Sequence, residues 1–201
     1  ERQRRQGWTD HSSWRSSRAD ESMCSSWTRR TSLGSSSVSD LAIVNASPLV
    51  FLGNAGHLEL LRAIGSRRFV VPHAVFEEVV SSKHCDRASV AVKQAEWLER
   101  ATAGGVPAPV AAWDLGPGES EVIALGLANP AARLVIDDLA GRKCGLALGL
   151  DIIGTLGVVI AAHRRGVVAD PALVFSELRA AGMWVSDAVI ATALRIAAGA
   201  E

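Results

Sequence analysis

The sequence predicts an α/β domain built around a parallel sheet. Three short apolar runs carry this prediction, at residues 43–44, 70–71 and 134–136, and helix-forming residues follow each of them. Strands that alternate with helices are typical of a parallel sheet with crossover helices. Two of the runs end on polar or acidic residues, and the other leads into a helix with paired carboxylates. In open α/β sheets, ligands bind at the carboxyl ends of the strands.

The predicted elements follow one another from residue 41 onward. Strands are expected at 41–45, 69–71, 133–137 and 150–153, with another short strand around 110–113 inside the Pro- and Gly-rich connection 104–117. Helices are expected at 48–51 continuing through 57–64, and at 72–81, 88–101, 118–128, 140–148, 156–165, 171–181 and 187–198. Asp170 before Pro171 and Ser186 are N-cap signals for the last two helices, and Gly182 is a stop signal.

One main domain is expected, because the chain has 201 residues, of which 48% are hydrophobic. The longest apolar stretches, 41–53 and 152–162, are interrupted by polar residues or Gly and fall short of the ~20 residues that a membrane span needs. The formal net charge is zero, so no strong positive field indicates a nucleic-acid partner. A metal site can nevertheless hold a phosphate backbone without a basic surface.

The cysteines argue against a disulfide framework and against a zinc site. Cys24, Cys85 and Cys144 are odd in number and lack C-x-x-C spacing. A reducing, cytoplasmic location is therefore expected.

Residues 1–37 differ from the rest of the chain. They are rich in Arg and Ser, show no apolar periodicity and lack the apolar stretch of a secretory signal, so no fixed fold is expected there. An organelle transit peptide is an alternative, although acids such as Asp10 and Asp20 argue against it. We prefer an over-long reading frame, with the protein starting near Val38. The expected division is therefore 1–37 as an extension, 38–168 as the main domain and 169–201 as C-terminal helices packed on it.

Oxygen-bearing side chains recur at the predicted strand ends and helix starts. Asn45 ends the first strand, Glu78 lies in the helix after the second, Glu119 begins another helix, and Asp137 and Asp138 follow the strand at 134–136. Such hard oxygen ligands at one edge of a sheet predict a site for a divalent cation such as Mg²⁺. Two adjacent acids need the rim of the sheet, because a core does not tolerate them unpaired.

Helical spacing separates two neighbouring acids of the helix at 118–128. Glu119 lies three and four residues before Val122 and Ile123, on the face that meets the sheet, and is the better ligand. Glu121 lies on the far side and is expected to be a first-turn acid that complements the helix dipole. Spacing does not separate Glu77 from Glu78 in their own helix.

Several of these residues have a purely structural alternative. Asn45 can hold the strand-to-helix turn, Ser47 can cap the helix opened by Pro48, and Asp137 or Asp138 can cap the helix that follows them. Thr155 either supplies a hydroxyl behind the site or caps the next helix. Arg142 either holds a phosphate, pairs with one of the acids, or lies on the surface.

Five motifs, in order and at suitable spacing, resemble those of the PIN-domain nucleases. They are Asn-Ala-Ser-Pro-Leu at 45–49, Val-Pro-x-x-Val-x-x-Glu-Val at 71–79, Gly-Glu-x-Glu-x-Ile-Ala-Leu at 118–125, Ile-Asp-Asp-x-x-Gly-Arg at 136–142 and Gly-Thr-Leu-Gly at 154–157. The similarity runs from about residue 41 to the C-terminus and is strongest to the VapC-like prokaryotic subgroup with a C-terminal helical extension. It implies a Rossmann-like three-layer α/β/α sandwich, Mg²⁺- or Mn²⁺-dependent phosphodiester hydrolysis, RNA as substrate and a small antitoxin as partner.

The register of the resemblance also selects the site residues. It favours Glu78 over Glu77, and Asp138 over Asp137, which remains a second candidate. With Glu119 and Asn45 these form the expected catalytic metal site, and the residues expected to orient a ligand or contact phosphate are Ser47, Arg142 and Thr155. Asn45 is a departure, because PIN nucleases generally have Asp there. A neutral amide oxygen should lower the metal affinity.

The resulting hypothesis is a metal-dependent endoribonuclease, the toxin of a toxin–antitoxin pair. A divalent cation polarises a phosphoryl oxygen and lowers the pKa of bound water, so neither a Ser–His nor a Cys–His pair is needed. The alternative is a catalytically weakened PIN-like module that binds RNA or a partner protein. The C-terminal helices are a candidate surface for a homodimer or for the antitoxin, and no membrane partner is expected.

Overall fold

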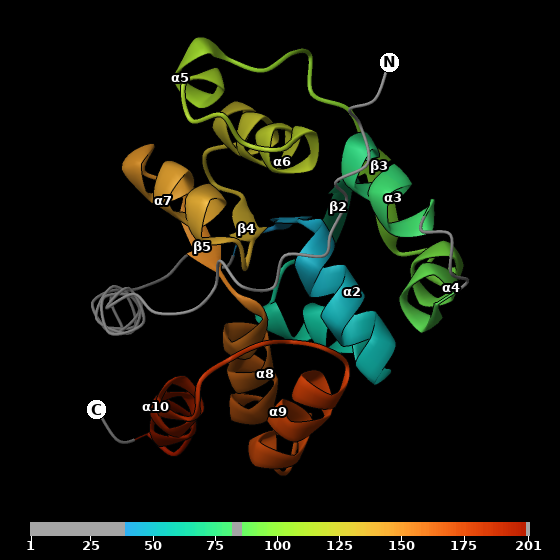
Figure 1. Ribbon diagram of the computed structural model, residues 1–201, viewed down its shortest axis with the longest axis vertical. Coiled ribbons are helices and arrows are strands. Elements are labelled where there is room, and N and C mark those ends of the chain that lie inside the picture. The colour runs from blue at the N-terminus through green and yellow to red at the C-terminus, as the bar shows by residue number, and fades with distance from the viewer. Residues whose placement is uncertain (1–38, 82–85, 200–201) are drawn as a thin grey trace, which may run out of the picture. The chain divides into compact units, whose positions relative to one another are not determined.

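The structure is a computed structural model that describes residues 39–81 and 86–199, all within one compact unit, Ser35–Glu201. Its centre is a parallel sheet with the strand order β3-β2-β1-β4-β5 (Figure 1). The strands are β1 Leu41–Val44, β2 Arg68–Pro72, β3 Leu98–Ala101, β4 Arg133–Val135 and β5 Asp151–Ile153. The α/β class with a parallel sheet is therefore confirmed.

Helices connect the strands and continue beyond the last one. In chain order they are α2 Ala46–Ala55, the 3-10 helix η1 Leu58–Ile64, α3 His73–Val80, α4 Arg87–Gln94, α5 Ala108–Ala111, α6 Pro117–Ala128, α7 Leu139–Ala147, α8 Thr155–Arg164, α9 Pro171–Ala180 and α10 Asp187–Ala197. The chain moves outward from β1 in one direction to β2 and β3, and in the other to β4 and β5. Because such crossovers are right-handed, α2, α3 and α4 cover one face of the sheet and α6 and α7 the other, as in a Rossmann-like α/β/α sandwich.

The core fills the space between these layers with aliphatic side chains. Ile43, Val44, Leu134 and Ile136 come from the central strands and are at most 1% exposed. Helix α6, which packs against β1 and β4, adds the fully buried Ile123. Central strands of a parallel sheet are covered on both faces, which explains their continuous apolar runs.

The expected helix at 88–101 is wrong in its second half. Helix α4 ends at Gln94, and residues 98–101 form the edge strand β3, paired with β2. The sequence Leu98-Glu99-Arg100-Ala101 has no apolar alternation, because Glu99 and Arg100 are exposed. Charged residues are usual on an edge strand, where they discourage pairing with other chains.

Two further expectations differ from the structure. The short strand expected at 110–113 is wrong, since the segment forms the helix α5, preceded by Pro107 and carrying Pro109 in its first turn. Pro is favoured at the start of a helix. The expected run from 48 to 64 is two elements, because Gly56 adopts the left-handed conformation with φ 79° and ends α2 before η1 begins.

The predicted caps of the C-terminal helices are confirmed. Asp170 accepts from the backbone N–H of Ala172 at 2.9 Å, Ser186 caps α10, and Gly182, with φ 96°, follows the end of α9. Helix α9 packs against α2 and α8, and α10 packs against α8 and α9. A 2.6 Å hydrogen bond between His57 and Glu177 also links α9 to the turn after α2.

None of the helices described is long and apolar enough to cross a membrane. Cys144 is free and buried. The expectations for residues 1–37, and those for Cys24 and Cys85, lie outside the described residues.

Candidate metal-binding site

The site is built at the point where the strand order reverses, between β1 and β4. The backbone N–H of Asn45 donates to Val135 O at 3.0 Å, and that of Ile136 donates to Ile153 O at 2.9 Å. The carboxyl ends of β1, β4 and β5 are therefore held level with one another. In doubly wound sheets this reversal opens a crevice for ligands.

Asn45 is the most deeply buried of the four expected ligands. It is 2% exposed and is the N-cap residue of α2, with extended backbone angles. Its side chain makes no capping hydrogen bond to α2, so the turn-forming alternative receives no support from a cap contact.

Helices α3 and α6 bring Glu78 toward Asn45 across a glycine. A Cβ placed on Gly118 would lie 3.1 Å from Val75 Cγ2, 3.2 Å from Glu78 Oε2 and 3.9 Å from Asn45 Oδ1. The absence of a side chain on Gly118 therefore lets α3 approach α6 closely. The carboxylate of Glu78 and the amide oxygen of Asn45 both border that space.

Glu119 and Asp138 come together around a second glycine. A Cβ on Gly141 would lie 3.6 Å from Asp138 Oδ2 and 3.7 Å from Glu119 Cγ. Asp138 is the N-cap of α7, and its Oδ2 accepts from Gly141 N at 2.7 Å. The capping role predicted as an alternative for Asp138 is thus confirmed, and it leaves this carboxylate beside Glu119.

Nearby carboxylates disfavour the charged forms of Glu78 and Glu119. Burial, and next the charge of Glu119, raise the pKa of Glu78. Burial, and next the charge of Asp138, raise the pKa of Glu119 against the opposing effect of backbone hydrogen bonds at Gly116 and Glu119. Glu78, Glu119 and Asp138 thus form a row of mutually repelling carboxylates, which we call the acid row. A cation placed along it would relieve that repulsion.

The acid row is open rather than a closed cage. Across the described segments 39–81 and 86–199, no three His, Cys, Asp or Glu side chains are close enough together to hold one metal ion. This spacing does not fit a structural zinc or a calcium cage. A cation here would have to be held by one or two of these carboxylates together with water and substrate phosphates, as Mg²⁺ often is.

Asp137 uses both carboxylate oxygens in a separate contact with Thr155. Its Oδ1 accepts from the backbone N–H of Thr155 at 2.8 Å, and its Oδ2 accepts from the Thr155 hydroxyl at 2.6 Å. Burial raises the pKa of Asp137, while the two bonds from Thr155 and the charge of Arg142 lower it. Both oxygens are engaged in joining β4 to α8, so the structure gives Asp137 a supporting position rather than an open one.

Arg142 belongs to the same contact. Its Nη1 donates to Ile136 O at 3.0 Å, and a Cβ on Gly154 would lie 3.0 Å from both Arg142 Nη1 and Asp137 Oδ1. Burial lowers the pKa of this guanidinium, and the charge of Asp137 opposes that effect. Of the three alternatives for Arg142, proximity to one of the acids is the one observed.

Two capping predictions are wrong. Helix α2 begins at Ala46 with Asn45 as its N-cap, so Ser47 is the second helical residue and not the cap. Pro48 is tolerated as the third residue because the first N–H groups of a helix have no partner within it. Thr155 does not cap α8 either, since Gly154 holds that position and the Thr155 hydroxyl contacts Asp137.

Glu121 has a role that the sequence did not reveal. Its Oε2 accepts from Ala74 N at 2.8 Å and its Oε1 from Ala103 N at 3.1 Å. We expected Glu121 to complement the dipole of its own helix, α6. Instead it binds the first turn of α3 and the segment after β3. One sequence signal existed, because Pro72 precedes α3 and cannot cap it with a side chain. Glu77, by contrast, is exposed, as expected for a solvated neighbour.

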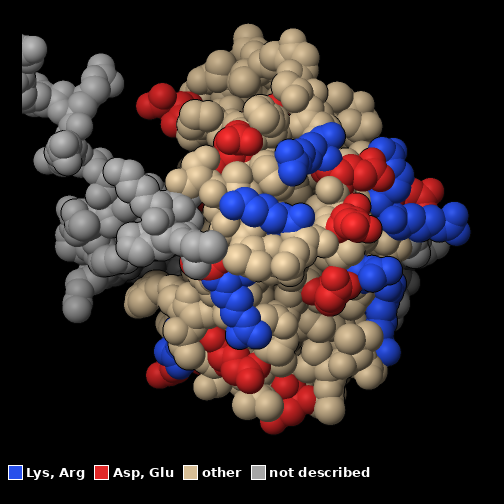
Figure 2. Space-filling model, turned by 90° about the vertical axis from the view of Figure 1, so that its right-hand side faces the viewer, with Lys and Arg blue, Asp and Glu red and all other residues tan. Residues whose placement is uncertain are grey.

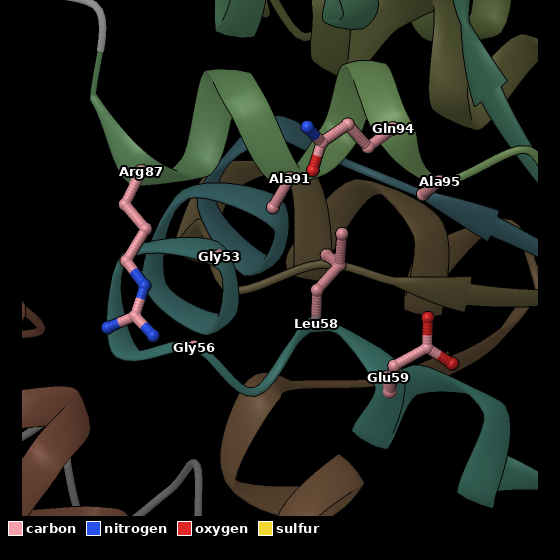
Figure 3. A pocket seen from close by; sticks show the side chains of 8 residues that line it. All are labelled: Gly53, Gly56, Leu58, Glu59, Arg87, Ala91, Gln94 and Ala95. Carbon is pink, nitrogen blue, oxygen red and sulfur yellow. The ribbon is translucent and has the colours of Figure 1, made fainter.

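A pocket elsewhere on the fold does not include any of these acids. It has a volume of about 310 Å³ and lies between α2, η1 and α4. Figure 3 shows Arg87 and Glu59 toward opposite ends of it, with Gln94 between them. Its wall includes Gly53 from the C-terminal half of α2, whereas Asn45 precedes that helix, so the pocket and the acid row lie at opposite ends of α2.

The surface charges do not form a basic patch on the face that carries β3. Figure 2 shows Lys and Arg interspersed with Asp and Glu on the face at the right of Figure 1. Arg68 pairs with Glu99 at 2.6 Å on exposed neighbouring strands, and Arg62 pairs with Glu59 at 3.1 Å. This face therefore offers no uniform positive field for a phosphate backbone.

A comparison with protein-family models agrees with the geometry. A model described as a PIN domain matches residues 41–199, from β1 through the last helix. A comparison with curated proteins finds no match. The match covers most of the chain, together with the parallel sheet and its helices, and the chain therefore belongs to the PIN-domain family, whose members are generally nucleases.

Proposed function

We propose that the chain is a Mg²⁺- or Mn²⁺-dependent endoribonuclease, acting as the toxin of a VapC-like toxin–antitoxin pair. The observation that supports this most directly is the acid row at the carboxyl edge of the sheet, where Glu119 stands between Glu78 and Asp138. Glu119 and Asp138 are half-buried, and carboxylates gathered there are costly unless a cation meets them, so their gathering indicates a functional use.

Each residue of the site then has a definite task. Glu78, Glu119 and Asp138 would supply negative oxygens to the cation, and Asn45 would supply a neutral amide oxygen. A bound Mg²⁺ ion would polarise the phosphoryl oxygen and lower the pKa of its water. The hydrogen bond from Gly141 N fixes the orientation of the Asp138 carboxylate, because it occupies one side of Oδ2.

RNA and a small antitoxin are the proposed partners, and a homodimer is proposed as the assembly. The C-terminal helices are the proposed surface for protein contacts. Leu173 and Trp184 support this choice, because they are 58% and 66% exposed on and beside α9. Exposed large apolar side chains mark contact surfaces when they occur together with other apolar residues.

A second candidate is a PIN-like module that binds RNA or a partner without cutting it. Asn45 favours this candidate, because it places a neutral, 2% exposed side chain where a carboxylate would add charge to the site. A weaker metal site can leave binding intact while it slows hydrolysis.

Cleavage of an end-labelled single-stranded RNA by the purified full chain separates the two candidates. The nuclease should cut with Mg²⁺ or Mn²⁺, stop with a chelator, and lose activity in Glu119→Gln. Glu77→Gln is the matched control, because it removes the same charge from an exposed position. Metal-independent RNA binding without cleavage would favour the binding module, and metal-stimulated cleavage unaffected by Glu119→Gln would contradict the proposed site.

A further inference from the structure

Glu121 joins three parts of the fold with one carboxylate. It projects from α6, and it accepts hydrogen bonds from Ala74 N at 2.8 Å and from Ala103 N at 3.1 Å. Ala74 lies in the first turn of α3, and Ala103 follows the edge strand β3.

The contact has an electrostatic reason to exist. The first N–H groups of a helix lack intrahelical partners and carry a partial positive charge, so a carboxylate binds them well. Pro72, at the N-cap of α3, makes no side-chain capping bond. Glu121 supplies that missing acceptor from a neighbouring helix, and its charge strengthens both bonds.

The same two helices carry acids that repel each other. Glu78 lies on α3 and Glu119 on α6, and Glu78 Oε2 borders the space beside Gly118, the residue before Glu119, so two like charges face each other across the two helices. This repulsion acts to separate α3 from α6. Gly118 permits their close approach, but it contributes no attraction of its own.

We propose that Glu121 is a positioning residue that holds α3 against α6, and so keeps Glu78 within reach of the cation despite the charge of Glu119. This inference rests on the proposed metal site and adds to it a residue that touches neither metal nor substrate. Supporting residues of this kind hold a metal ligand in place before the metal arrives.

The first test is a calorimetric titration of Mn²⁺ into the full chain and its variants. Glu121→Gln should weaken Mn²⁺ binding by about tenfold to a hundredfold, the usual cost of removing a partner of a metal ligand. Glu77→Gln, which removes an exposed acid next to Glu78, should bind as the parent does. Unchanged binding in a folded Glu121→Gln protein overturns the proposal. If that variant does not unfold cooperatively, Glu121→Asp replaces it, because it keeps the charge but is too short to reach both donors.

The variant Glu78→Gln separates this inference from the proposed function. Weakened Mn²⁺ binding in Glu78→Gln but not in the Glu121 variants overturns only the positioning role. Unchanged binding in Glu78→Gln overturns the metal site itself, and the positioning role with it.

The second test distinguishes positioning from ordinary helix capping. Glu121→Gln should lower the unfolding temperature of the metal-free protein less in a Glu78→Gln background than in the parent. In that background Glu78 no longer repels Glu119, so the hydrogen bonds of Glu121 have no repulsion to oppose. Faster amide exchange at Ala74 and Ala103 should accompany the loss. Equal losses of unfolding temperature in both backgrounds would show that Glu121 only caps α3, and would overturn the proposal.

Discussion

Thr155 donates two hydrogen bonds to Asp137, one from its backbone N–H at 2.8 Å and one from its hydroxyl at 2.6 Å. The two residues come from the end of β4 and the start of α8, and Thr155 is fully buried. A half-buried carboxylate such as that of Asp137 is stabilised by such partners, because its charged form is otherwise costly. The contact fixes the chain directly before Asp138, so it helps to position the Asp138 carboxylate at one end of the acid row.

Thr155→Val should therefore destabilise the protein. It removes the hydroxyl bond to a charged group, which typically contributes about 1.5–3 kcal/mol, and it leaves the backbone bond in place. Urea unfolding of the metal-free protein measures the loss. Thr155→Ser keeps the hydroxyl and should lose less. Thr192→Val removes a hydroxyl that donates to Ala188 O and accepts from Arg195, both in exposed contacts of α10, and should change stability by at most about 0.5 kcal/mol. Equal effects of the two Val variants would contradict this role of Thr155.

The strands that the sequence predicted are those that contain apolar residues in a row. β1, β2 and β4 contain them because helices cover both of their faces, and β5, the half-exposed strand at the other edge, contains Ile152 and Ile153. β3 was missed because it has no such run, since Glu99 and Arg100 face solvent. Local sequence could not show this strand, since its formation depends on pairing with residues about thirty positions earlier.

The sequence predicted some contacts of the candidate site and missed others. Helical spacing indicated that Glu119 faces the sheet and Glu121 does not, and the structure places Glu119 beside Asp138. The actual partners of Glu121 could not be found by spacing, because Ala74 lies 47 positions away. The contact between Asp137 and Thr155, 18 positions apart, could not be predicted either, because it depends on the pairing of β4 with β5.

Gly118→Ala should weaken metal binding. The added Cβ would lie 3.1 Å from Val75 Cγ2 and 3.2 Å from Glu78 Oε2, so either α3 moves away from α6 or the Glu78 side chain turns. We expect Mn²⁺ affinity to fall by about tenfold, equivalent to about 1.4 kcal/mol. Calorimetric titration of Mn²⁺ measures the change.

Gly126→Ala is the control for Gly118→Ala, since it lies in the same helix and meets only the ends of Leu134 and Leu150. Both substitutions gain about 1 kcal/mol of helix propensity, so their difference reports the contacts. Parent-like Mn²⁺ affinity in Gly118→Ala, or an equal loss in Gly126→Ala, would argue against a close α3–α6 approach at Glu78.

Stability should depend on pH through the acid row. The pKa of Glu78 is raised above its usual 4.5 in the folded protein, so the folded state binds the proton more tightly than the unfolded state does. Stability therefore falls as pH rises from about this value through the raised pKa. Glu78→Gln removes the penalty, so the variant should be more stable than the parent at neutral pH without metal.

Thermal unfolding in a chelator, measured from pH 4 to pH 8, checks this expectation. The advantage of Glu78→Gln over the parent should shrink as the pH falls toward the usual pKa, because both side chains are then neutral. Glu77→Gln is the matched control, because it removes the neighbouring acid of the same helix. A Glu78→Gln protein that is less stable than the parent at neutral pH would contradict the proposed repulsion.

The charge at position 45 should set the strength of metal binding. Asn45 is 2% exposed and borders the same space as Glu78, so Asn45→Asp adds a negative charge where the cation is expected. We expect Mn²⁺ to bind more tightly and RNA cleavage to need less metal. The metal-free protein should become less stable, because a buried carboxylate without a counter-ion is costly. The opposite signs of these two effects distinguish a metal site from a turn-forming Asn, which should change stability slightly and metal affinity not at all.

Asp138→Asn completes the comparison with the charge removed instead of added. Asn can still accept the hydrogen bond from Gly141 N at 2.7 Å, since Asn and Asp are equally good N-cap residues. The helix start should therefore survive while the acid row loses one of its charges. Mn²⁺ affinity should fall below that of the parent, giving the order Asn45→Asp, parent, Asp138→Asn from tight to weak. Calorimetric titration of the three proteins gives this order directly, and three indistinguishable isotherms would show that neither residue contributes to a metal site.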